Sequence, residues 1–399
     1  MAEPLGRYIA RQTRPLPPLA ELPAAPEALA PLAQMIAGAQ IMALGESFHH
    51  THEQLALRDQ IVRYLVAQHG FNLILLEVIT PGPNPIDTFV QGGDGSAEEA
   101  LIEAGARMWR NRETAALIHW LRAHNAQVQG GAVSVRGIDV MAIGPLMRAV
   151  AGHSRTDDGA RIAALSAGFN IDGRADQAAY NKLDATDRAL LKRFFAEAHI
   201  TLVERAELAE QARAVLRALE MLEAGTQGWL AGFALRDEAM AEAAMHAVNA
   251  AGVDAKAIIL SHNTHIAAMA PITEPSHAPM GWSLRQRYGS AYFALGMAFG
   301  RAQFDPPIYG VSAFPGEAGT ADHHIAELGH GAAWVDLRSA DPKQILRMQG
   351  VGVGPHAYTE YHNLSAFDAL VYVDTLTNAQ QLVETELTMD VKAVDATRS

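Results

Sequence analysis

The fold is decided by the segment Ile41-Met42-Ala43-Leu44-Gly45-Glu46-Ser47-Phe48-His49-His50-Thr51-His52-Glu53. An apolar run ends in Gly-Glu, a short turn carries several histidines, and an amphipathic stretch follows. This pattern predicts a strand over 40–44 that leads into a helix over 55–69. Ligands of open α/β sheets bind at the carboxyl ends of the strands. Ionisable side chains beside apolar strands are costly unless they are paired, so Glu46 and His49 indicate chemistry at this strand end.

The rest of the chain continues the alternation of apolar runs and helical patterns. Predicted strands cover 71–78, 132–140, 257–260, 291–299, 333–337 and 367–373, and predicted helices cover 26–37, 112–125 and 236–251. Prolines and glycines between residues 80 and 96 predict a loop at the same sheet edge. Strands that alternate with helices indicate an α/β fold, a three-layer α/β/α arrangement with a mostly parallel central sheet.

A helical region interrupts this alternation. Helix-forming residues dominate 141–232, with helices predicted over 187–197 and 202–224. The region is far longer than an ordinary crossover connection. We therefore expect residues 1–140 and 233–399 to form an α/β catalytic core, and 141–232 to form an inserted helical lobe that covers the active-site cleft.

Composition excludes several classes of protein. The chain has 399 residues, a formal charge of −13 and no cysteine, so disulfides, thiolate nucleophiles and zinc–thiolate sites are ruled out. No run of Lys and Arg indicates nucleic-acid binding, and no apolar run is long enough for a membrane span or resembles a signal-peptide core. We expect a cytoplasmic protein without nucleic-acid or membrane partners, a monomer or a weak homo-oligomer.

Three predicted strand ends carry groups suited to acid–base chemistry. They are Glu46 with His49, Glu77, and His262 with His265, and Arg58 lies on the helix after the first strand. Imidazole is the usual general base near neutral pH, and a second His or an Arg stabilises an oxyanion. This set suits direct attack of water on an ester. Because the chain contains no Gly-x-Ser-x-Gly motif, Ser47 and Ser261 are only outside candidates for a nucleophile.

Two alternatives use the same residues. Glu46, His49, Glu77, His262 and His265 could together hold zinc, manganese or iron, although the His-Glu-x-x-His helix of zinc proteases is missing. Metal-free acid–base catalysis needs the same groups, so we expect no cofactor but leave a divalent metal open. A haem or metal carrier is the third possibility, and the two carboxylates argue against it.

At this point the chain resembles the erythromycin esterase family over residues 38–374. The resemblance rests on motifs that occur in family order. They are Gly45-Glu46-x-x-His49 with Thr51, Glu53 and Arg58; Gly70-Phe71 before the strand that ends near Glu77; Trp109-Arg110-x-x-Glu113; Trp120-Leu121-Arg122-x-x-Asn125; Gly137-Ile138-Asp139; Arg236-Asp237-x-x-Met240; His262-Asn263-x-His265; Met280-Gly281-x-x-Leu284; Gly289, Tyr292 and Gly296; and Phe367-Asp368-Ala369-Leu370-Val371-Tyr372.

The resemblance implies an α/β/α fold with an added helical part and metal-independent opening of a macrolide lactone, an antibiotic-resistance activity. It implies that His49 is the general base, that Glu46 and Glu77 orient and polarise the imidazoles, and that His262 and His265 complete the site. Arg58 would support the site or steady the developing negative charge. Another ester remains the alternative substrate.

The substrate side of the site is predicted more loosely. A macrolactone is large and mostly apolar, and it needs a broad apolar wall, which Met108, Trp109, Phe233 and Met269 are expected to supply in part. Similar sequences usually carry glycine directly after the motif histidine, where this chain has His50. Because glycine permits backbone shapes that histidine resists, either the turn is conventional here or an extra imidazole enters the cleft.

Overall fold

The computed structural model describes residues 3–79, 84–128, 132–141, 143–154, 157–169, 173–272, 274–341, 343–350 and 358–382. In this part of the chain nine strands form one sheet, ordered β1-β8-β11-β6-β2-β5-β3-β4 with β7 paired to β6. The strands are β1 Thr13–Pro15, β2 Ile41–Leu44, β3 Leu73–Ile79, β4 Ser134–Asp139, β5 Ala257–Leu260, β6 Tyr292–Ile308, β7 Val311–Phe314, β8 Ala332–Asp336 and β11 Ala369–Leu376. β9 Leu346–Gln349 and β10 Tyr358–Tyr361 form a separate antiparallel pair.

The sheet is mostly parallel. β11, β6, β2, β5, β3 and β4 all run in the same direction, and only β1, β7 and β8 pair antiparallel to their neighbours. The carboxyl ends of β2, β5, β3 and β4 therefore meet at one edge of the sheet. This edge is where the predicted site residues follow their strands.

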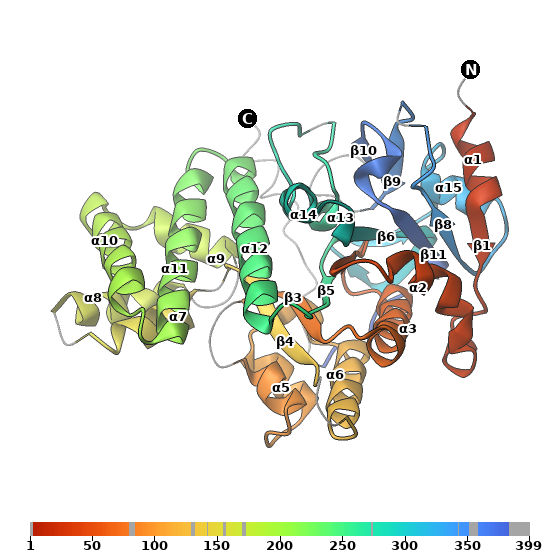
Figure 1. Cartoon of the computed structure of the whole chain (residues 1–399). Helices are drawn as coiled ribbons and strands as arrows, with labels where there is room; N and C mark the ends of the chain where they lie inside the picture. Colours follow the sequence, from red (N-terminus) through yellow and green to blue (C-terminus); the bar gives the residue numbers. More distant parts are fainter. Residues whose placement is uncertain are drawn as a thin grey trace.

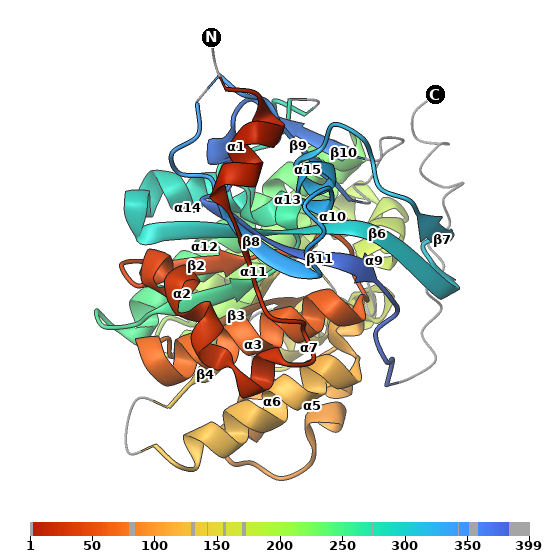
Figure 2. The ribbon, with the colours of Figure 1, turned by 90° about the vertical axis from the view of Figure 1, so that its right-hand side faces the viewer.

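Helices cover both faces of the sheet, as Figures 1 and 2 show. They are α1 Leu5–Gln12, α2 Ala30–Ile36, α3 His52–His69, α4 Pro85–Val90, α5 Ala97–Glu103, α6 Arg112–Asn125, α7 Gly144–Ala151, α8 Asp157–Leu165, α9 Gly173–Asn181, α10 Ala185–Thr201, α11 Ala206–Gly225, α12 Trp229–Ala251, α13 Asn263–Ile266, α14 Met280–Tyr288 and α15 Ala321–Ala326. Gly70 ends α3 in a left-handed conformation, with φ of 70°, the usual role of a glycine at this point.

Alternation along the strands builds the three layers. Met42 and Leu44 of β2 belong to the apolar cluster that includes α3 and α6, and Ile41 and Ala43 belong to the cluster on the other face, with α12 and α14. A strand covered on both faces is apolar at every position. The predicted three-layer α/β fold with a mostly parallel sheet is therefore confirmed.

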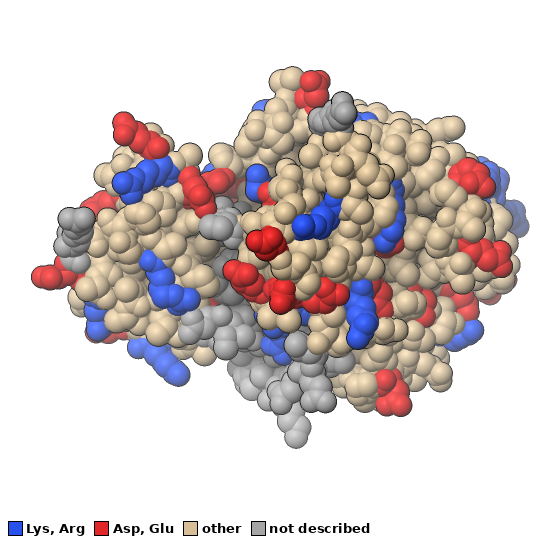
Figure 3. Space-filling view, turned by 90° about the horizontal axis from the view of Figure 1, so that it is seen from below, with Lys and Arg blue, Asp and Glu red and all other residues tan. Residues whose placement is uncertain are grey.

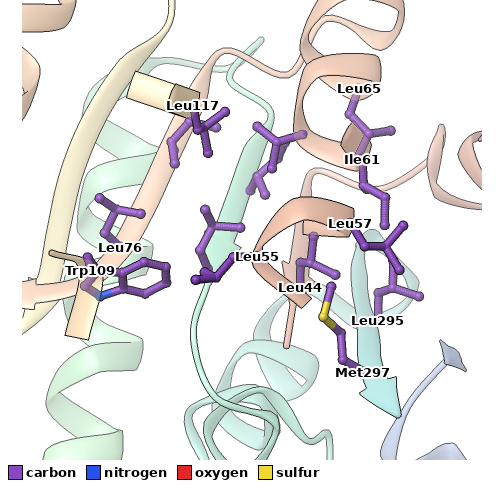
Figure 4. Packing of buried hydrophobic residues seen from close by; sticks show 14 of the residues in the cluster. Leu44, Leu55, Leu57, Ile61, Leu65, Leu76, Trp109, Leu117, Leu295 and Met297 are labelled. Carbon is purple, nitrogen blue, oxygen red and sulfur yellow. The ribbon is translucent and has the colours of Figure 1, made fainter. Parts of the chain in front are cut away.

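One core cluster lies directly behind the predicted site. Figure 4 shows Leu44, Leu76, Leu295 and Met297 of the strands packed near side chains of α3 and α6. Such close packing fixes the position of α3, because a displacement would open voids in a dense interior. Arg58 lies on this helix, so the core holds its guanidinium at the strand ends.

The helices α7 to α11 stand apart from the sheet, beside α12 (Figure 1). They have an apolar cluster of their own, which includes Met147, Phe195 and Leu219. α12 packs along α11 and also contacts β4, so it belongs to both parts. That residues 141–232 are a separate lobe that covers the cleft stays a prediction.

The sequence prediction of a loop over 80–96 was wrong for part of that segment. α4 occupies Pro85–Val90, where Asn84 accepts a hydrogen bond from the Ile86 N–H and Pro85 stands in the first turn, which tolerates proline. Residues 80–83 lie outside the described residues. β6 also runs to Ile308, past the predicted end at 299, and from Arg301 to Asp305 its residues alternate between exposed and buried, a strand pattern that a search for continuous apolar runs does not detect. No described helix is long and apolar enough to cross a bilayer.

Candidate active site

A histidine–carboxylate pair lies at the end of β2. Gly45 follows the strand, and a Cβ there would meet the Asn263 side chain at 1.9 Å, so this position accepts only glycine. His49 Nδ1 lies 2.6 Å from Glu46 Oε1. Since a carboxylate accepts, Nδ1 carries the proton and Nε2 keeps its lone pair. The His49 side chain is 20% exposed and that of Glu46 is 5% exposed.

Arg58 sets the charge balance of this pair. It is buried, its Nη2 donates to the carbonyl oxygens of Gly45 at 2.8 Å and Ser261 at 3.3 Å, and its Nη1 lies 3.7 Å from Glu46. Burial alone would raise the pKa of Glu46, but the charges of Arg58 and His49 hold it below its usual range. Burial likewise opposes a charge on His49, yet the Glu46 carboxylate raises the His49 pKa above its ordinary value.

His262, at the end of β5, faces this pair as a neutral ring. The centroids of the His49 and His262 rings are 5.0 Å apart. His262 Nδ1 accepts from the Thr264 N–H at 3.2 Å and lies 2.8 Å from Thr264 Oγ1, so the ring proton is on Nε2. Burial, followed by the charge of His49, lowers the His262 pKa to about 3. His262 is therefore a neutral N–H donor beside His49.

Glu77 anchors the inner side of the site. Its Oε2 accepts from Ser261 Oγ at 2.6 Å and from the His262 N–H at 3.1 Å, and its Oε1 accepts from Arg236 Nη2 at 2.8 Å. Burial alone would raise its pKa, but His265 and Arg236 lower it. Arg236 also makes a bidentate pair with Asp139, at 2.9 and 2.7 Å. The carboxylates at the ends of β3 and β4 thus share one buried guanidinium.

His265 is fully engaged, in contrast to His49. Its Nδ1 lies 2.7 Å from Asp237 Oδ1, and its Nε2 accepts from Arg236 Nη1 at 2.9 Å. The second oxygen of Asp237 lies 2.5 Å from His277 Nε2. The structure therefore places His265 in a buried network, where it holds Arg236 and Asp237 rather than offering a free nitrogen.

Sequence reasoning missed four members of this network as site residues. Arg236, Asp237 and Asp139 were noted only as parts of motifs, and His277 was not noted. The sequence did contain a signal for Arg236 and Asp237, which are adjacent charged residues in the Ala-rich α12 (Trp229–Ala251). Both are buried in the structure, and buried charges need partners. His277 carried no comparable signal, since it follows a segment with no regular pattern.

The predicted apolar wall is dispersed. Trp109 is buried, donates from Nε1 to the Glu77 carbonyl at 3.0 Å and lies under Arg58 at 5.0 Å, so it supports the site from behind. The ring of Phe233 lies 5.0 Å from that of His265. Met108 and Met269 are half-buried and pack against clusters on opposite faces of the sheet. Of these residues, Phe233 and Trp109 adjoin the predicted site side chains.

Neither outside nucleophile candidate is free. Ser261 Oγ donates to Glu77 and is fully buried. Ser47 Oγ accepts from Gln54 Nε2 at 2.5 Å and is buried. A serine needs an adjacent general base to become nucleophilic, and these partners are a carboxylate and an amide, so direct attack by water agrees better with the geometry.

The turn after His49 keeps the shape that glycine favours. His50 has φ of 62°, a left-handed conformation that is uncommon outside glycine. Its ring is buried, and burial, followed by the charge of His49, lowers its pKa to about 4. Among the residues that the structure describes, no group of three or more His, Asp and Glu is placed to hold a metal ion.

Fold and site together define a three-layer α/β protein with a cluster of paired histidines, carboxylates and arginines at the carboxyl ends of its parallel strands. The family model of erythromycin esterase matches residues 66–376, and the chain belongs to this family. Erythromycin esterase type II of Escherichia coli is 23% identical over 298 residues, which cover 67% of this chain and 70% of that protein.

Solved structures share the fold. A succinoglycan biosynthesis protein matches with a TM-score of 0.77 at 20% identity, over 94% of this chain and 97% of that one. A Bacillus cereus protein matches with a TM-score of 0.76 at 20% identity, over 95% and 98%. A mutant of the erythromycin esterase EreC in its open conformation matches with a TM-score of 0.69 at 18% identity, over 90% and 96%.

Proposed function

We propose that this protein hydrolyses an ester of a small molecule, and that the ester is the lactone of a macrolide antibiotic. Membership of the erythromycin esterase family supports the reaction class. The pair of His49 and Glu46 carries the proposal: His49 is a half-buried, carboxylate-bound imidazole whose Nε2 has no hydrogen-bond partner among the described residues. This is the form of a general base.

In the proposed reaction, His49 Nε2 removes a proton from a water molecule while the water oxygen attacks the lactone carbonyl carbon. The resulting imidazolium is stabilised by Glu46, which is held ionised by Arg58 and His49. The carbonyl oxygen becomes an oxyanion, and the neutral Nε2–H of His262, whose ring lies 5.0 Å from that of His49, is a candidate donor to it. When the carbon–oxygen bond of the ring breaks, His49 returns the proton to the leaving alkoxide, giving an acid and an alcohol in one opened chain.

The remaining residues act on these groups. Glu77 accepts from the backbone N–H of His262 and therefore fixes the chain at the end of β5, while Thr264 orients the His262 ring. Arg58 binds the carbonyl oxygens of Gly45 and Ser261, so it ties the β2 and β5 exits together. A spacing error of about 1 Å between base and donor can cost on the order of 10²-fold in rate, which gives these contacts a role in catalysis.

The test is incubation of the purified protein with macrolides of different ring sizes, followed by mass spectrometry. We expect product that has gained one water, formed by the wild type and not by a folded His49→Gln variant. A parallel series with simple carboxylic esters separates the two parts of the proposal. Hydrolysis of simple esters without any macrolide would overturn the macrolide assignment alone, and hydrolysis of neither would overturn the function.

Two further arms test metal dependence and resistance. The proposed mechanism predicts that activity survives exhaustive treatment with a chelator, measured with the same mass assay. Activity lost to the chelator and restored by zinc or manganese would overturn the metal-free route. Cells that produce the wild type should tolerate more macrolide than cells that produce His49→Gln, measured as the inhibitory concentration.

A further inference from the structure

Two strained residues meet beside the proposed base. Among the described residues, His50 and Tyr309 are the non-glycine residues with positive φ, at 62° and 52°. They lie far apart in the sequence, yet their ring centroids are 5.9 Å apart. Each ring is also 6.4 Å from the ring of His49. The backbone strain of the described chain is thus concentrated at one side of His49.

The positive φ angles of His50 and Tyr309 destabilise the folded chain, and glycine at either position would avoid this cost. A left-handed conformation costs a non-glycine residue about 1–2 kcal/mol. Tyr309 and Gly310 are the two central residues of the turn between β6 and β7, where Ile308 pairs with Val311, and Asn-Gly is the preferred pair in such turns. Strained residues of this kind cluster at functional sites.

The backbone hydrogen bond at position 50 does not depend on the histidine side chain. The His50 carbonyl accepts from the Ala379 N–H, a bond that any residue would make. The His50 Nδ1 atom is buried without a hydrogen-bond partner in the described part of the chain. An unsatisfied buried polar atom costs about 1–3 kcal/mol, so this ring adds a second cost at the same position.

The Tyr309 ring is held in place from behind. It stacks on Phe48 with a centroid distance of 6.2 Å and an interplanar angle of 20°, and Phe48 is buried against Phe304 at 4.8 Å. Tyr309 itself is half-buried, so part of its side chain is exposed. The long β6 strand therefore carries an aromatic side chain to the edge of the His49–His50 turn.

We infer that His50 and Tyr309 form a specificity subsite next to His49, which holds a neutral, hydroxyl-bearing segment of the ester substrate. The Tyr309 ring packs against the apolar part of that segment, and the His50 imidazole bonds to its hydroxyl. Neither side chain brings a charge, so the subsite selects against carboxylate and ammonium groups. The inference rests on the proposed function and names a part of its substrate.

The test compares two macrolides that differ in a single hydroxyl of the lactone ring. His50→Gly and Tyr309→Asn are the variants, because glycine and asparagine tolerate positive φ. We expect each variant to unfold at the same or a higher temperature than the wild type. In His50→Gly, kcat/KM for the hydroxylated macrolide should fall about 10-fold or more, a loss of about 1.4 kcal/mol, and for the deoxy analogue it should change less than 3-fold. In Tyr309→Asn, which removes the apolar contact, kcat/KM should fall by a similar factor for both macrolides. Ser312→Ala, on the exposed part of β7, is the matched control and should change neither.

The outcomes separate the subsite from the proposed function. Unchanged kcat/KM for both macrolides in either variant would overturn the subsite, and so would equal losses for both in His50→Gly, because the hydroxyl would then not be recognised. If the wild type turns over neither macrolide, the proposed function fails, and calorimetric dissociation constants of the two compounds still decide the subsite. A hydroxyl preference in the wild type that disappears in His50→Gly supports it, and equal affinities in the wild type overturn it.

Discussion

Two histidine–carboxylate pairs at the strand ends have the same geometry but different surroundings. His49 Nδ1 lies 2.6 Å from Glu46, and His265 Nδ1 lies 2.7 Å from Asp237. The difference is the second nitrogen of each ring. His265 Nε2 accepts from Arg236, whereas His49 Nε2 has no hydrogen-bond partner among the described residues and the side chain is 20% exposed. Pairing with a carboxylate therefore does not by itself make a histidine a general base. The second ring nitrogen must also be without a hydrogen-bond donor.

Position in the fold explains this difference. His49 stands on the turn after β2, at the open edge of the sheet, and His265 lies on α13 beneath α12. α12 supplies both the acceptor and the donor of His265 through the adjacent residues Asp237 and Arg236. The comparison suggests that the His49–Glu46 pair performs the chemistry and that the His265–Asp237 pair supports the structure. The following variants test this assignment.

The largest effect is expected from exchanging the two histidines for glutamine separately. His49→Gln should lower kcat by about 10²–10⁴-fold, the contribution of a general base, with little change in the unfolding temperature. His265→Gln should lower the unfolding temperature more than His49→Gln does, because it breaks a buried network, and it should lower kcat less than His49→Gln does. Steady-state kinetics and thermal unfolding of both variants give the answer. A larger loss of kcat in His265→Gln than in His49→Gln would reverse the assignment.

Arg236→Met should produce the largest loss of stability. The variant leaves the buried carboxylates of Glu77 and Asp139 without their guanidinium, and such a loss typically costs about 3–5 kcal/mol. Arg213→Met is the control, because its partner Glu242 is part of a more exposed pair on the helices and such pairs contribute about 0–1 kcal/mol. Denaturant unfolding measures both. Similar values for the two variants would show that Arg236 is not the centre of the support network.

His277 should make the support network weaken at alkaline pH. Burial opposes its charge, but its hydrogen bond to Asp237 and the nearby carboxylate of Glu274, 3.6 Å from its Nδ1, raise its pKa to about 9. A histidine with a raised folded pKa contributes stability that is complete below its unfolded pKa, near 6.5, and is lost between there and pH 9. The unfolding free energy of the wild type should decline over this range more than that of His277→Gln. Parallel pH profiles for the two proteins would contradict the ion pair.

The sequence could predict those strands and site residues that are marked by a local pattern. The apolar run before Glu46 predicts β2 and the position of His49, and the same reasoning applies to Glu77 and His262 at their strand ends. The sequence could not show that both ring nitrogens of His265 already have hydrogen-bond partners. Those partners come from α12, and long-range contacts leave no local pattern. Tyr309 was missed for a similar reason: β6 has to extend beyond the sheet before its turn reaches the His50 ring.

The smallest effect concerns the ionisation of His49 itself. The Glu46 carboxylate raises the pKa of His49 above its ordinary value, against the effect of burial. Because the base acts only when unprotonated, the rate should rise with pH as His49 loses its proton. Glu46→Gln removes the nearest charge that favours the imidazolium, so the acidic limb of the kcat/KM profile should move to lower pH, on a lower plateau. Asp237→Asn, which alters the other pair, should leave the limb in place. If Asp237→Asn moves it and Glu46→Gln does not, the titrating base is His265, and the roles of the two centres are exchanged.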